Sequence, residues 1–82
     1  MTLQKRSIHL SGHGTSLALE PAFWAVLERM AAEAGLSLAA VLASVDAGRG
    51  GAPLASSCRL AALAHLQGKL ADIGDPTVTI GE

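Results

Sequence analysis

The three histidines and the single cysteine are the residues of this 82-residue chain best suited to metal binding or nucleophilic catalysis. His9 and His13 are four residues apart, a spacing that would align two metal ligands on a helix. This segment is instead strand-like and contains a glycine-rich turn, so the four-residue spacing does not align the two side chains. His65 has no Cys, Asp or Glu within four residues on either side. The sequence therefore predicts no metal site.

Catalytic and phosphate-binding motifs are not recognisable either. Cys58 lies among Ser56, Ser57 and Arg59; an adjacent arginine and a helix start can lower a thiol pKa, yet a small semi-buried thiol is the commoner outcome. The glycine-rich segment 48–51 lacks the Gly-Lys-Ser or Gly-Lys-Thr ending of a nucleotide-binding loop. Neither paired carboxylates nor a Ser/His/Asp or Cys/His setting can be picked out. We expect no catalytic residues and no cofactor, and a metal-dependent enzyme is the weakest hypothesis.

Length and composition predict one small domain. The chain is 50% hydrophobic and 16% charged, with a mean hydropathy of +0.40, which is more apolar side chain than one small core can bury. We therefore expect a homo-oligomer. The single cysteine cannot form an intrachain disulfide, in agreement with a reducing compartment. The apolar runs are interrupted by charges and are shorter than a membrane span, and the N-terminal region is too polar for a signal peptide, so we expect a cytoplasmic protein without membrane contact.

The charge balance argues against a strongly basic nucleic-acid module. The formal net charge is −1 and the sequence pI is about 6.3, whereas such modules often have a pI above roughly 9. Any DNA binding must therefore depend on where the few basic residues lie, and Lys5 and Arg6 form the first basic pair.

Alternating residues near the N-terminus predict strands. From Thr15 to Glu20, Leu17 and Leu19 fall on one side and Ser16 and Ala18 on the other, which is the period of a half-buried strand. Upstream, Ile8 and Leu10 alternate with polar residues. The segment 11–14 between them is rich in turn formers, so a hairpin within the chain is possible.

Two helices are predicted next. Pro21 suits a first helical residue, and Gly35 suits a left-handed C-terminal stop. Ser37 is a good N-cap for the second helix, which ends at the flexible segment 47–51. The apolar stripe of the first helix is predicted as Phe23, Val26, Leu27, Met30 and Ala34, and that of the second as Leu38, Val41, Leu42 and Val45.

A third amphipathic helix is predicted after Pro53, with Ser56 or Ser57 as its cap and with Leu60, Leu63, Leu66 and Leu70 as its stripe. We place the domain, with this helix, in residues 1–67. Residues 68–82 form a tail in which Thr77–Ile80 could add a short strand or stay disordered.

A strand running into a proline-started helix, a Gly-X-Ser turn and a second helix resembles the ribbon-helix-helix family, the Arc and MetJ class of dimeric DNA-binding proteins. The resemblance covers about Lys5 to Val45. More closely, the chain resembles short bacterial proteins with a ribbon-helix-helix domain, and Leu54 to Leu66 resembles their closing helix. The motifs that carry this closer resemblance are Lys5-Arg6-Ser7, Gly12-His13, Thr15-Ser16, Leu19-Glu20, Phe23-Trp24, Gly35-Leu36-Ser37-Leu38 and Arg49-Gly50-Gly51.

The resemblance implies a mainly α fold with a short β-ribbon, an additional C-terminal helix and an intertwined homodimer, in which strands of two chains pair antiparallel. The dimeric ribbon would enter the major groove of duplex DNA. The dimer core would contain Leu17, Leu19, Phe23, Val26, Leu27, Met30, Val41 and Leu42. The DNA contacts would be Lys5 and Arg6 as a phosphate arm, Ser16 and Ala18 facing the bases with Gly14 at the entry, and Ser37 and Leu38 offering backbone amides to a phosphate.

The predicted base-facing residues differ from those of a sequence-specific reader. Specific base contacts are mostly made by Arg, Lys, Asn or Gln, whereas this face has Gly14, Ser16 and Ala18, and related sequences would often place an arginine at the position of Gly14. Our first hypothesis is a transcriptional regulator. The alternative is a protein-interaction or antitoxin-like module with the same dimeric fold, whose partner binds the third helix or Thr77–Ile80.

Overall fold

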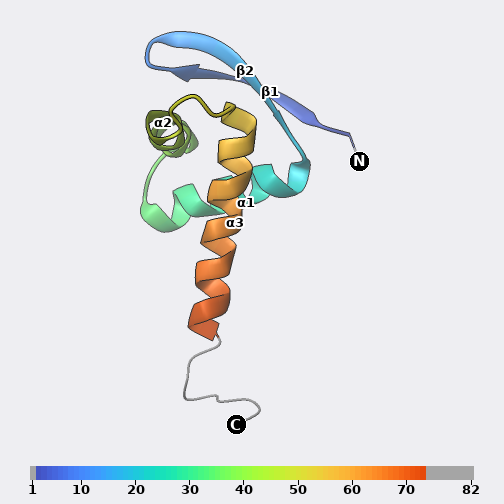
Figure 1. The fold of residues 1–82 in the computed structure, drawn as a ribbon, viewed down its shortest axis with the longest axis vertical. Coiled ribbons are helices and arrows are strands. Elements are labelled where there is room, and N and C mark those ends of the chain that lie inside the picture. Colours follow the sequence, from blue (N-terminus) through green and yellow to red (C-terminus); the bar gives the residue numbers. More distant parts are fainter. Residues whose placement is uncertain (1, 74–82) are drawn as a thin grey trace.

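The computed structural model describes residues 2–73, which form an antiparallel hairpin followed by three helices (Figure 1). The strands are β1 (Gln4–Leu10) and β2 (His13–Leu19), and the helices are α1 (Pro21–Ala34), α2 (Leu38–Gly48) and α3 (Leu54–Ile73). This confirms the predicted fold class, a mainly α domain with a short ribbon and an additional helix. The predicted strand at 77–80 lies outside the described residues.

The hairpin closes through a two-residue turn. Ser11 and Gly12 both have positive φ, 53° and 80°, which is the backbone of a type I′ turn and matches the right-handed twist of paired strands. β1 and β2 then pair in one register, with Ser7 opposite Ser16. The hairpin within the chain is therefore present, and one chain alone makes the two-stranded ribbon that we expected two chains to build.

Helix α1 begins and ends where the sequence predicts. Pro21 opens it, and Gly35 adopts the left-handed conformation, with φ 70°, just after its end. The Gly35 and Leu36 amides donate to the carbonyls of Ala32 and Ala31, so two of the last carbonyls of the helix are satisfied.

The buried face of α1 differs from the predicted stripe by about one residue. Its buried residues are Trp24, Leu27 and Ala31. Phe23, Val26 and Met30 are only partly buried, and Ala34 is exposed. The indole of Trp24 explains this rotation, because its Nε1 donates a 2.8 Å hydrogen bond to the Gln4 carbonyl of β1, which fixes Trp24 beneath the hairpin.

Helix α2 follows the prediction closely. The Ser37 hydroxyl accepts a 3.0 Å hydrogen bond from the Ala40 amide, which confirms Ser37 as the N-cap. Val41 and Leu42 are buried, and Leu38 and Val45 are partly buried against the core.

The predicted stripe of α3 is wrong. Its buried residues are Cys58 and Ala62, whereas Leu60, Leu63 and Leu70 are exposed. Small side chains at the contact allow α3 to lie close to α1 and α2, and the leucines then face outward. The helix also begins at Leu54, earlier than a serine cap would place it, and it continues beyond residue 67 to Ile73.

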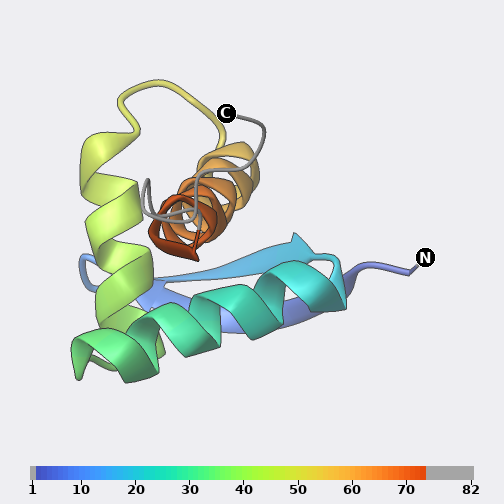
Figure 2. The ribbon, with the colours of Figure 1, turned by 90° about the horizontal axis from the view of Figure 1, so that it is seen from below.

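The helices pack on one side of the hairpin, and the core lies between them. Figure 2 views the hairpin from the helical side, with α1 crossing in front of it. The C-terminal half of α3 projects away from this body (Figure 1). The buried core is Leu10, Leu17, Leu19, Trp24, Leu27, Ala31, Val41, Leu42, Cys58 and Ala62. Of the residues expected in a dimer core, one chain alone therefore buries Leu17, Leu19, Leu27, Val41 and Leu42.

Among residues 2–73, no single helix is long and apolar enough to cross a membrane. α1 and α2 reach the necessary length and composition only as a pair, and that pair is bent by 103°.

Candidate nucleic-acid interface

The register of the hairpin decides which side chains share its outer surface. Residues directly opposite each other in an antiparallel pair project to the same side of the sheet. Leu17 and Leu19 are buried against the helices, so the alternate residues of β2 face outward together with their partners on β1. The outer pairs are Lys5 with Ala18, Ser7 with Ser16, and His9 with Gly14, and we call these six residues the ribbon face.

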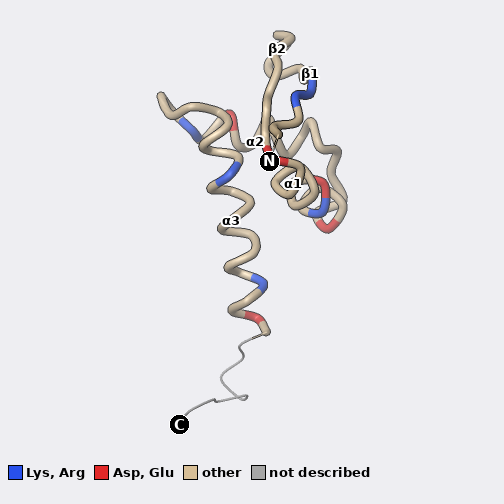
Figure 3. The backbone as a smooth tube through the Cα atoms, turned by 90° about the vertical axis from the view of Figure 1, so that its right-hand side faces the viewer, with Lys and Arg blue, Asp and Glu red and all other residues tan. Residues whose placement is uncertain are grey.

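The ribbon face is polar and open. Five of its six residues are exposed, and Ala18 is partly exposed. It offers one ammonium group from Lys5, two hydroxyls from Ser7 and Ser16 that both donate and accept, and the imidazole of His9. No acidic residue occurs between Gln4 and Leu19. Figure 3 shows the basic part of β1 on the hairpin and the acidic residues at the start of α1 and on the helices.

The structure brings Gly14, Ser16 and Ala18 together on one face, as predicted, and places Lys5 of the predicted phosphate arm and two further residues, Ser7 and His9, beside them. Ser7 and His9 were missed because their position depends on the pairing of β1 with β2. The alternation of Ile8 and Leu10 with Ser7 and His9 was the available signal.

Arg6 does not share the ribbon face with Lys5. Its guanidinium lies over the ring of Trp24, 4.4 Å from the centroid, and donates a 2.7 Å hydrogen bond to the Glu28 carboxylate of α1. Lys5 and Arg6 are consecutive residues of β1, so they point to opposite sides of the sheet. The predicted basic arm is therefore part of β1, with one cation on each side of the sheet.

The start of α2 lies beside the edge of β1. A groove of about 340 Å³ is lined by Ser7 and His9 of β1 and by Leu38 and Ala39 of α2. Within residues 2–73, the amides of Leu38 and Ala39 have no hydrogen-bond partner, whereas the Ala40 amide is held by Ser37. The predicted phosphate site at Ser37 and Leu38 thus flanks the ribbon face, with its free N–H groups at a helix N-terminus.

The edge of β2 borders a second groove, of about 520 Å³. Thr15, Ser16 and Ala18 line one side of it, and Asp46 and Arg49 line the other. Arg49 is held by Asp46 at 2.6 Å and donates to the Ala52 carbonyl at 2.6 Å, so its charge is neutralised within the loop. Over the part of the chain that the structure describes, β2 makes backbone hydrogen bonds to no strand but β1.

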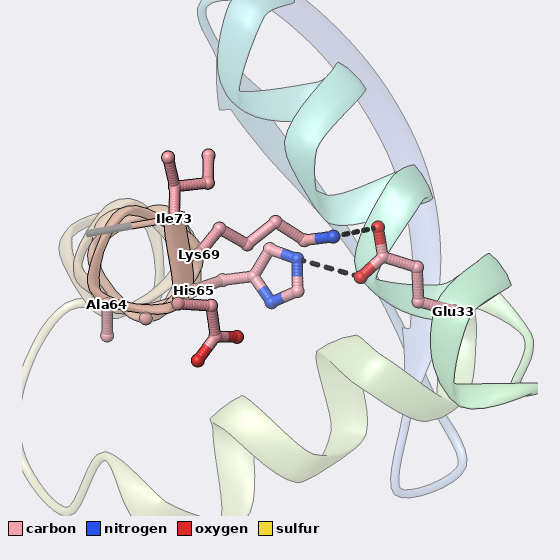
Figure 4. Close-up of a pocket in the computed structure, with 7 residues that line it drawn as sticks. Glu33, Ala64, His65, Lys69 and Ile73 are labelled. Atoms are coloured by element: carbon pink, nitrogen blue, oxygen red, sulfur yellow. Dashed lines mark ion pairs between the residues drawn. The ribbon is translucent and has the colours of Figure 1, made fainter. Parts of the chain in front are cut away.

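The other charged clusters connect helices. The Glu33 carboxylate of α1 contacts two residues of α3 (Figure 4). It accepts a 2.7 Å hydrogen bond from Lys69 Nζ and lies 3.3 Å from His65 Nε2. The hydrogen bond from Lys69 lowers the pKa of the Glu33 carboxyl. Arg59 pairs with Glu20 at 2.9 Å and likewise lowers the pKa of that carboxyl. In the described residues, no three His, Cys, Asp or Glu side chains gather as metal ligands would.

Residues 3–66 match a ribbon-helix-helix domain family, a match that spans the hairpin, α1, α2 and most of α3. The chain belongs to this family. Ribbon-helix-helix domains generally bind DNA, as transcription regulators or antitoxins, generally dimerise and are typically not enzymes. No curated protein and no solved structure matches the chain significantly. The ribbon-helix-helix assignment therefore rests on the family match and on the hairpin-helix-helix order of the fold.

Proposed function

We propose that this ribbon-helix-helix protein is a transcriptional regulator that places its ribbon face in the major groove of duplex DNA. The observation that carries the proposal is the register of the hairpin, which gathers Lys5, Ser7, His9 and Ser16 on one exposed face. A two-stranded ribbon fits the major groove. A face without acidic residues avoids repulsion from the phosphates.

The proposal divides the contacts into two kinds. Lys5 and the free amides of Leu38 and Ala39 would bind phosphates, which position a protein on DNA without reading its sequence. The hydroxyls of Ser7 and Ser16 would contact base edges, and a serine hydroxyl can hydrogen-bond to several different bases. We therefore expect strong salt dependence and modest sequence preference.

The binding form is proposed to be a homodimer. The outward edge of β2 has backbone groups with no strand partner over residues 2–73, and the adjoining groove gives an approaching strand room. Antiparallel pairing of β2 with β2 of a second copy would join two hairpins into one sheet. It would also double the number of phosphate-binding groups on the ribbon surface.

The test is fluorescence anisotropy of labelled genomic-fragment duplexes titrated with the full chain at about 50 and about 200 mM salt, the range over which phosphate-driven affinity falls steeply. We expect tight binding that weakens with salt. Lys5→Ala should weaken binding several-fold on every duplex and reduce the log–log salt slope by roughly 1 for each phosphate that the lysine neutralises in the wild type. Ser16→Ala should change the ranking of duplexes.

The matched control is Arg29→Ala, which removes the same charge from an exposed position of α1 outside the ribbon face. It should leave the salt slope unchanged. Equal losses of affinity for Lys5→Ala and Arg29→Ala would reduce the effect to net charge and contradict the ribbon face as the binding surface. No binding at the lower salt would remove the DNA-binding proposal and move a protein-interaction module to first place.

A further inference from the structure

The outward side of α3 carries four apolar residues in a regular pattern. Leu63, Leu66, Leu70 and Ile73 follow one another at intervals of three, four and three residues. Leu63, Leu70 and Ile73 are 47%, 66% and 73% exposed, and Leu66 is partly exposed. None of the four packs against the core. We call these four residues the α3 seam.

The spacing of the α3 seam is that of the a and d positions of a coiled coil. Residues at these positions line one side of a helix and insert between the corresponding residues of a second helix. A surface helix of a single folded chain would instead turn its leucines toward its own core. The α3 seam therefore has the pattern of a helix that packs against another helix, while residues 2–73 of its own chain supply none.

The projecting part of α3 has little support within one chain. All residues from 67 to 73 are exposed, and Figure 1 shows this end of the helix extending away from the body. Helices in proteins owe most of their stability to packing of an apolar face. Leu63, Leu70 and Ile73 leave between about half and three quarters of their surface exposed, and an exposed apolar patch on a monomer marks an interaction site.

The basic residues near the α3 seam are paired with carboxylates on the side of α3 that faces α1. Lys69 is held by Glu33 at 2.7 Å and Arg59 by Glu20 at 2.9 Å, so both cations are drawn toward α1. Of the exposed residues between Leu63 and Ile73, Ala64, Gln67, Gly68 and Ala71 are uncharged, Lys69 is held by Glu33, and Asp72 carries a negative charge at one end of the seam. Two copies of the seam can therefore approach without bringing unpaired like charges together.

We propose that α3 of a second copy of this chain covers the α3 seam in antiparallel orientation. About a two-fold axis near Gly68, Leu63 meets Ile73 of the second copy and Leu66 meets Leu70 of the second copy, so all four residues are covered. Antiparallel helix dipoles attract. This orientation also places the two bodies at opposite ends of the shared helix pair. The surface lies at the other end of the molecule from the ribbon face (Figure 1), so the inference stands independently of the proposed DNA binding.

The first test is the solution mass of the full chain, measured by sedimentation equilibrium. The double variant Leu63→Glu/Leu70→Glu loses the contact through α3 and keeps the proposed pairing of β2, so its mass should fall below that of the wild type at the same concentration. Ala64→Glu/Ala71→Glu adds the same two charges one residue further along the helix and should keep the wild-type mass. Circular dichroism confirms that each variant is folded. Equal masses for the wild type and the Leu63→Glu/Leu70→Glu variant would overturn the proposal, and the seam would then belong to a different protein partner.

The second test fixes the orientation without placing charge on the helix. Leu66→Cys and Leu70→Cys are prepared as separate variants, mixed and oxidised. Antiparallel packing predicts that the disulfide between the two different variants dominates. If disulfides between two Leu66→Cys chains predominate, the orientation is parallel and the antiparallel proposal is overturned. Absence of any cross-link beyond that of the wild type would overturn the second copy as the occupant.

Discussion

The imidazole of His9 lies across the ribbon over Gly14, and its Nε2 is 3.6 Å from the position that a Cβ on Gly14 would occupy. This is ordinary van der Waals distance, so the backbone and the ring tolerate a side chain at residue 14. Because Gly14 has no side chain, His9 alone occupies this end of the ribbon face.

Gly14→Arg should increase DNA affinity. The new guanidinium would project from the ribbon face beside His9 and bind phosphate or guanine. We expect tighter binding to every duplex and a log–log salt slope steeper by about 1 for each additional phosphate neutralised. The measurement is anisotropy at several salt concentrations. A salt slope identical to that of the wild type would place residue 14 away from the DNA.

Arg6→Ala should reduce stability and leave DNA binding nearly unchanged, the reverse of Lys5→Ala. Arg6 lies over Trp24 and pairs with Glu28, and the two partly exposed interactions together are worth about 1 kcal/mol. Urea unfolding measures the loss of stability, and anisotropy of a labelled duplex measures binding. A decrease of the salt slope as large as that for Lys5→Ala would show that Arg6 reaches the phosphates after all.

Trp24→Phe should destabilise the domain by about 1–3 kcal/mol, because it removes part of a buried ring and leaves the Gln4 carbonyl without its indole donor. Circular dichroism must follow the unfolding, since Trp24 is the only tryptophan. Phe23→Leu is the control, because Phe23 is only partly buried and should tolerate the change better. A larger loss of stability for Phe23→Leu would favour the stripe of α1 that helical periodicity predicts.

The positions where the chain changes direction could be predicted from single residues. Pro21, Gly35 and Ser37 act through local backbone geometry and local hydrogen bonds, which depend little on the rest of the fold. The turn at Ser11–Gly12 belongs to the same class. The order of strands and helices therefore followed from the sequence, and so did half of the ribbon face.

The buried faces of α1 and α3 could not be predicted in the same way. Helical periodicity indicates that a stripe exists, but the neighbouring elements decide which side is covered. On α3, the larger leucines were predicted as the buried stripe in place of Cys58 and Ala62. The small side chains of these two residues are what allow α1 and α2 to lie close to α3. Ser7 and His9 required the pairing register, which is set by contacts between strands and not by either strand alone.

Acid should weaken the contact between α1 and α3. Glu20 and Glu33 have lowered pKa values in the folded chain, because Arg59 and Lys69 hydrogen-bond to their charged forms. Their contribution is present above the ordinary glutamate pKa of about 4.3 and is lost as the pH falls through the lowered values. Urea unfolding across this range should show the loss. Glu20→Gln/Glu33→Gln should flatten the curve, and parallel curves for variant and wild type would contradict the assignment.

Alkaline conditions should reveal the burial of Cys58. The thiol is fully buried, and burial raises its pKa in the folded chain. The folded state therefore keeps its proton at pH values where the unfolded thiol, with a pKa of about 8.5, ionises. Stability that is present below this value should be lost as the pH rises above it. Comparing urea unfolding at about pH 7 and about pH 9.5 measures the loss, and Cys58→Ala, which has no proton to release, should lose less over the same interval.

A thiol reagent should label Cys58 of the wild type only as fast as the domain opens. Rapid labelling of the folded chain would show that α1 and α2 do not cover Cys58.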